Sequence, residues 1–176
     1  MKLRYLAGLS FALLMLATTA AAQVDSRDAT REKLRAVLAA TGPKVNIEFH
    51  QSDKNPYNFI GVLNTGLTNV DSFEVVVGIT TDATIGFRIY PHYRGAYINL
   101  NRAANVQGLA RQLLRLSDTN FLFWGIDETG DVFAGYTFTL ESGFPEQAVR
   151  VVLYSIKPLD QYVAEIKINV DGAQSH

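Results

Sequence analysis

The sequence predicts an α+β fold, in which an antiparallel sheet of five to seven strands carries three helices. One observation behind this prediction is a run of short apolar segments with a two-residue period over residues 45–100, separated only by turns. A second is that segments with a helical period flank this run and a later hairpin. Because strands joined by short turns pair antiparallel, the order helix, five strands, helix, hairpin, helix favours this class over a parallel α/β sheet.

The first helix is predicted over residues 28–41, where Gly42-Pro43 ends it. Its apolar residues recur at helical spacing and form one narrow stripe of Leu34, Val37, Leu38 and Thr41. The strands that follow are predicted at residues 45–50, 57–63, 72–80, 85–89 and 97–100. The strict alternation within residues 45–50 indicates one buried face and one solvated face.

The second half begins with a helix that starts near Asn101 or Asn105 and ends at Leu116. A hairpin follows, with strands at residues 120–126 and 132–140 around a polar turn. The last helix is predicted to start near residue 143, with Ser142 as its cap, and Pro158 must break or kink it. One domain therefore spans residues 23–170, followed by a disordered tail at 171–176.

Residues 1–22 have the pattern of a secretory signal peptide. Lys2 and Arg4 form a positive start, an uncharged apolar segment follows, and Ala20-x-Ala22 fits the cleavage rule before Gln23. A retained membrane anchor is the alternative, but a spanning helix needs about 20 apolar residues and this segment is shorter. The leader predicts a periplasmic or secreted protein with no stable membrane insertion after cleavage.

Composition excludes several classes of function. Without Lys2 and Arg4 the chain has 14 basic and 17 acidic residues, and a net charge of −3 gives no electrostatic reason to bind nucleic acid. Cysteine is absent, which excludes disulfides, a thiol nucleophile and a cysteine-bound metal.

No motif predicts a catalytic residue, a cofactor or a metal site. His50, His92 and His176 lack metal-ligand spacing, and the sequence contains no G-x-S-x-G nucleophile motif. The acidic segment Asp127–Asp131 lacks the spacing of a calcium loop, and its glycine is typical of a hairpin turn. A small envelope hydrolase that uses His50 or His92 remains an alternative.

Two segments are candidates for binding. Aromatic and arginine side chains alternate in a segment that could bind a glycan, a peptide or another protein, or could be an ordinary exposed hairpin: Arg88, Tyr90, His92, Tyr93, Arg94 and Tyr97. Residues 121–126 are apolar on both faces, so one face meets the core and the other meets a helix or a second subunit. Leu122 and Trp124 are the residues predicted for such a homodimer interface.

The second half also carries a family resemblance. Its features are Leu113-Leu114-Arg115-Leu116, the apolar segment 121–126, the turn Asp127-x-x-Gly130-Asp131-Val132, and Leu159-Asp160-Gln161-Tyr162 in a long helix. Through these, residues 96–166 resemble the YbjN-like proteins and, more distantly, type III secretion chaperones of the CesT type. The resemblance implies a twisted antiparallel sheet covered by helices, commonly dimeric, that binds or regulates proteins without catalysis.

The leader and the resemblance together predict an exported, non-enzymatic, protein-binding or regulatory domain of the YbjN-like type. Its partner would be an unknown protein or envelope component, and it could form a homodimer. Those chaperones act in the cytosol, so the leader predicts a different location for this chain. The alternatives are the envelope hydrolase and a glycan- or peptide-binding module that uses Tyr90, Tyr93 and Tyr97.

Overall fold

The computed structural model describes residues 27–82 and 84–172. The predicted signal peptide, residues 1–22, lies outside the described residues, as does His176. Among the described residues, no helix is long and apolar enough to cross a membrane. The elements are a helix over residues 27–41, η1 (Gly42–Val45), β1 (Glu48–Gln51), β2 (Asn58–Leu63), β3 (Ser72–Ile79), β4 (Thr84–Tyr93), β5 (Ala96–Tyr97), η2 (Leu100–Arg102), α2 (Val106–Thr119), β6 (Phe123–Ile126), β7 (Val132–Thr139), α3 (Glu146–Tyr154) and α4 (Leu159–Asp171).

The strands form one antiparallel seven-stranded sheet in the order β1-β2-β3-β4-β7-β6, with β5 paired to the end of β4. This confirms the predicted α+β class and the upper limit of the predicted strand number. The prediction of three helices was wrong, because Pro158 divides the last one and the described residues form four α-helices. Strands β1 to β4 pair as successive hairpins, while α2 lies between β5 and β6 in the chain and allows β7 to pair with β4.

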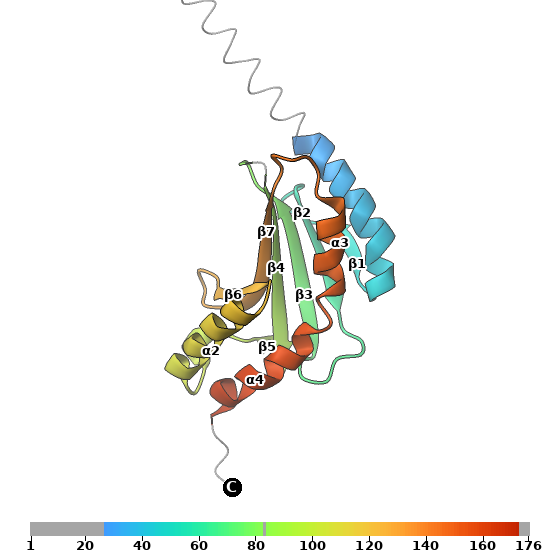
Figure 1. The fold of residues 1–176 in the computed structure, drawn as a ribbon. Coiled ribbons are helices and arrows are strands. Elements are labelled where there is room, and N and C mark those ends of the chain that lie inside the picture. Colours follow the sequence, from blue (N-terminus) through green and yellow to red (C-terminus); the bar gives the residue numbers. More distant parts are fainter. Residues whose placement is uncertain (1–26, 83, 173–176) are drawn as a thin grey trace, which may run out of the picture.

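One face of the sheet carries the core. Along β3, Phe73, Val75 and Val77 are fully buried, whereas the residues between them are half-buried. The helices bury their stripes in the same core, including Leu34 of the first helix, Leu109 of α2 and Val163 of α4. We call this side the helix face and the other side the open face. Figure 1 shows α3 running along the strands, with α4 near β5 at the end of the sheet.

Pro158 ends α3 and separates it from α4, as the sequence predicts. Proline has no N–H to continue the helical ladder, so residues 155–158 form turns and α4 leaves in a new direction. Both ends of α4 are attached to loops of the sheet. At its start, the buried Asp160 carboxylate accepts hydrogen bonds from the backbone N–H groups of Thr68, Asn69 and Val70, at 2.8–3.1 Å.

Several predicted boundaries were wrong. The strand predicted from residue 45 begins at Glu48, because a 3-10 turn and the left-handed backbone of Asn46 (φ 60°) precede it. The last helix begins at Glu146 with Pro145 as its N-cap, so Ser142 does not cap it. Asp171, assigned to a disordered tail, is the last residue of α4. Asn105 does cap α2, since its side chain accepts from the N–H of Gly108.

Candidate functional site

Strand alternation divides the arginine- and tyrosine-rich segment between two places. Arg88, Tyr90 and His92 project from β4 onto the open face, because the residues between them face the core. Tyr97 of β5 is the cross-strand neighbour of His92, so its side chain lies on the open face as well. Tyr93 and Arg94 instead lie at the β4–β5 turn, where Arg94 has a left-handed backbone (φ 55°). The six predicted binding residues therefore do not form one surface.

A carboxylate organises the part around Tyr97. The Tyr97 hydroxyl donates to Glu74 Oε2 at 2.9 Å, and the His92 ring lies 4.2 Å from the Tyr97 ring, centroid to centroid. Burial and the hydrogen bond to Glu74 raise the pKa of Tyr97 to about 12. The hydroxyl therefore stays protonated and bound to the carboxylate at neutral pH.

In the part of the chain that the structure describes, His92 is not hydrogen-bonded to a carboxylate or to a serine. Its Nε2 is 3.9 Å from Glu74 Oε2, which is too long for a hydrogen bond, and it is buried with no hydrogen-bond partner among the described residues. Ser72 is the cross-strand neighbour of His92, but no hydrogen bond links the two side chains. The other internal histidine, His50, is exposed at the end of the sheet. Among the described residues, neither His50 nor His92 is hydrogen-bonded to a serine or threonine hydroxyl, which is the contact that a serine–histidine mechanism uses.

The other two tyrosines of the segment are also engaged within the protein. Tyr90 is only 9% exposed, its ring lies 5.6 Å from that of Phe133, and burial raises its pKa. Tyr93 donates to Asp171 at the end of α4 at 2.8 Å, and Arg94 forms an ion pair with the same carboxylate at 2.9 Å. These contacts attach the β4–β5 turn to α4. Of the six residues, Arg88 and Arg94 are the exposed ones.

The acidic segment after β6 is a turn. Asp127 Oδ1 accepts hydrogen bonds from the N–H and hydroxyl of Thr129 and from the N–H of Asp131. Partial burial of Asp127 favours the neutral acid, but these hydrogen bonds outweigh it and lower the pKa. Among the described residues, no group of three or more acidic or histidine side chains is placed to hold a metal ion.

The predicted dimer residues face the wrong way. Leu122 and Trp124 are 1% and 4% exposed, because they point to the helix face and pack in the protomer's own core. The aromatic side chains on either side of Leu122, Phe121 and Phe123, are instead 52% and 42% exposed. Because residues 121–126 are apolar at every second position on both faces, the sequence could not show which of these side chains are buried.

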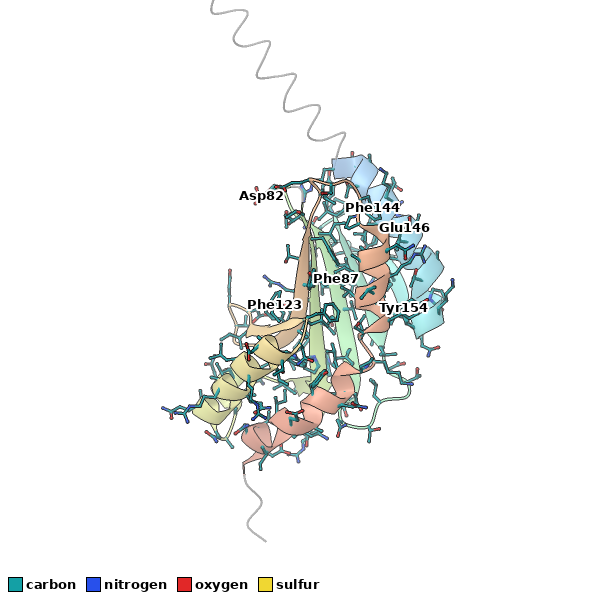
Figure 2. All side chains as sticks on the ribbon, viewed as in Figure 1. Asp82, Phe87, Phe123, Phe144, Glu146 and Tyr154 are labelled. Atoms are coloured by element: carbon teal, nitrogen blue, oxygen red, sulfur yellow. The ribbon has the colours of Figure 1, made fainter. Side chains whose placement is uncertain are left out.

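An apolar groove lies between this segment and the break in the last helix. It has a volume of about 340 Å³ and is lined by Asn120, Phe121, Leu122, Val151, Tyr154, Ser155, Pro158, Leu159 and Tyr162. None of these side chains is charged. Phe121, Val151 and Tyr154 are each more than half exposed at its mouth, and Figure 2 shows Tyr154 at the end of α3. Contiguous exposed apolar surface of this kind commonly marks an interaction site.

Sequence reasoning missed the groove because its walls come from segments 30 residues apart. Val151 and Tyr154 share an exposed face of α3, and their helical spacing was a visible signal. What the sequence could not show is that Pro158 turns α4 away and that Phe121, whose ring lies 5.7 Å from the Tyr136 ring, closes the other side.

Comparison with known proteins gives one structural similarity. No family model matches the sequence, and no curated protein matches it. A chain in the crystal structure of the ExsC–ExsE complex is similar to this one at 13% sequence identity. The match covers 81% of this chain and 98% of that chain, with a TM-score of 0.45. No match was found to the YbjN-like family that residues 96–166 resemble.

Proposed function

We propose that this protein is an exported, non-enzymatic domain that binds a partner protein through the apolar groove between residues 120–122 and the α3–α4 break. The observation that supports this proposal is the groove's uncharged lining, with three large side chains more than half exposed at its mouth. Apolar side chains of a partner would displace water from this surface, whereas a charged ligand would find no counter-charge in the lining.

The proposed location rests on the leader. Lys2 and Arg4 precede an uncharged apolar segment, and Ala20-x-Ala22 provides a cleavage site. The partner is therefore sought among envelope proteins. Mass spectrometry of the protein from the envelope fraction tests this part, because a chain that begins at Gln23 is expected and an uncleaved cytosolic chain would contradict it.

The groove is tested with a photo-crosslinking residue at Val151, compared between the wild-type background and two variants. Tyr154→Glu places a charge at the mouth of the groove and should abolish the crosslinks. Thr65→Glu adds the same charge at an exposed loop residue outside the groove and should leave them unchanged. Crosslinks that survive Tyr154→Glu would contradict the proposal.

A second observation supports a homodimer through α2. Leu114 is 71% exposed, and it lies between Arg111 and Asp118, both exposed and without an ion-pair partner among the described residues. In an antiparallel pair of α2 helices related by a two-fold axis near Leu114, Arg111 of each copy would lie opposite Asp118 of the other. The helix is thus complementary in charge to itself.

Light scattering after size-exclusion chromatography tests the homodimer. Leu114→Glu should give a monomer. Arg111→Asp should weaken the dimer, because it places two acidic residues opposite each other, and adding Asp118→Arg should restore it. A monomeric wild type at high concentration would refute the homodimer and leave the groove proposal intact.

A further inference from the structure

Half of β7 has a free edge. Along one side, β7 pairs with β4 from Ala134 to Thr139. Along the other side, β6 pairs only with Val132 to Gly135. Within residues 27–82 and 84–172, no strand therefore pairs with the second side of residues 136–139. The edge is free because the neighbouring strand, β6, begins only at Phe123, which pairs with Gly135.

The register identifies which backbone groups face this edge. The Trp124 N–H donates to Ser117 Oγ at 2.7 Å, so it points away from β7 and the pair Trp124–Ala134 is not hydrogen-bonded. In an antiparallel ladder the next pair, Phe123–Gly135, is then the hydrogen-bonded one. The N–H and C=O groups of Gly135 therefore point toward β6. Because the direction of these groups repeats every second residue, those of Thr137 and Thr139 point to the same side, where β6 is missing.

The surface beside this edge is apolar and adjoins the groove at Phe121. On the helix face, Tyr136 and Phe138 are half-buried, and their rings lie 4.8 Å apart. The Phe121 ring contacts Tyr136 and also lines the groove. A strand placed along the edge would therefore direct alternate side chains onto these aromatic rings.

We propose that the free edge of β7 accepts an extended segment of the partner protein as an added strand, with alternate apolar side chains directed into the groove. This inference rests on the function proposed above. Donor and acceptor pairs repeated every second residue fit an extended polypeptide. The free edge is only four residues long and ends against Phe123, so it suits a single segment better than the sheet of a second folded copy.

Thr137→Pro tests the proposal, because it removes an edge-facing N–H and leaves the ladder to β4 intact. Thr137→Val keeps this N–H and is the matched control. The probe is a fluorescent octapeptide of alternating valine and threonine, measured by anisotropy with the purified protein. Thr137→Val should bind within about twofold of wild type, and Thr137→Pro about tenfold more weakly or worse. Hydrogen exchange at Thr137 and Thr139 should slow on binding.

Equal binding of the peptide by Thr137→Pro and wild type would overturn the added strand, as would unchanged exchange or no binding by wild type. Loss of self-association in Thr137→Pro would assign the edge to a second copy and also overturn it. Should Thr137→Pro not fold, peptides methylated on alternate amides replace it. Methylation of the set that faces β7 should abolish binding and the other set should not, whereas equal effects would overturn the proposal.

The two proposals fail separately. If Tyr154→Glu blocks Val151 crosslinking to the envelope partner but Thr137→Pro does not change that crosslinking, the groove binds the partner without an added strand. If neither substitution changes it, both proposals are wrong.

Discussion

The hydroxyl of Ser117 binds the backbone of Trp124 at the place where a neighbouring strand would bind. The Trp124 N–H donates to Ser117 Oγ at 2.7 Å, and the Trp124 carbonyl lies 3.0 Å from the same oxygen. Since β6 is the last strand of the sheet, this contact covers its edge with α2. Covering an apolar edge strand in this way protects the protein from edge-to-edge association.

Ser117→Ala should reduce the free energy of unfolding by about 1–3 kcal/mol, because it leaves the Trp124 N–H without a partner. The variant should also self-associate more than wild type. Ser155→Ala is the control, since that hydroxyl bonds only a carbonyl within its own helix turn. Denaturant unfolding and light scattering measure the two effects, and equal stability of the two variants would contradict the role of Ser117.

Asp160→Ala should lower the free energy of unfolding by about 3 kcal/mol or more, because several N–H groups of the β2–β3 loop lose their acceptor together. Asp160→Asn keeps one acceptor oxygen and should have a smaller effect. Asp53→Ala, at an exposed turn residue, should be neutral. Faster hydrogen exchange at Thr68, Asn69 and Val70 in Asp160→Ala would place the loss at this loop, whereas unchanged exchange would contradict it.

Tyr97 should make stability decline at high pH. Its pKa is raised to about 12 in the folded protein. A group whose pKa is raised on folding stabilises the protein fully below its unfolded pKa of about 10, and this contribution disappears as the pH rises toward the folded value. Thermal unfolding should therefore show a decline between pH about 10 and about 12 that is smaller in Tyr97→Phe, where the raised pKa of Tyr90 still contributes.

Glu74→Gln provides a second test of the same contact. Removal of the negative charge should lower the tyrosine pKa, but not to its ordinary value, because burial is the larger cause of the shift. Ultraviolet titration of the tyrosinate form follows this change. A late titration step that persists in Tyr97→Phe would assign it to another tyrosine.

Two glycines of the sheet should respond oppositely to alanine. A Cβ at Gly61 would lie 2.5 Å from Ile47 and 2.9 Å from Phe49, so Gly61→Ala should destabilise the protein by about 1–3 kcal/mol. A Cβ at Gly86 would meet nothing within 4 Å, so Gly86→Ala should stabilise it by about 0.5–1 kcal/mol, because alanine loses less entropy on folding. Chemical denaturation of both variants checks the difference in sign.

Local patterns in the sequence predicted the elements better than they predicted the site. The two-residue period predicted the strand at residues 72–80, which the structure has as Ser72–Ile79, and Pro158 identified the break in the last helix. Periodicity could not choose the buried face of residues 121–126, because both faces are apolar. That choice depends on α2, whose Ser117 binds Trp124 from outside the strand.

The groove and the free edge of β7 depend on relations that no single segment contains. Phe121 and Tyr154 come from different segments and line the groove together with Pro158, where the last helix breaks. Likewise, the interleaved arginines and tyrosines looked like one surface in the sequence, but strand alternation sends Tyr90 and Tyr93 to opposite faces. There each hydroxyl finds a different carboxylate environment, with Asp127 near Tyr90 and Asp171 bound to Tyr93.

The attachment of α4 at both ends has a consequence for the order of folding. Asp160 holds a loop about 90 residues earlier in the chain, and Asp171 holds a turn 78 residues before it. The core therefore remains incomplete until the last residues of the domain are available, and contacts at such separation form slowly. For the export proposed above, this delay would be an advantage, because a chain that is threaded across a membrane must pass unfolded.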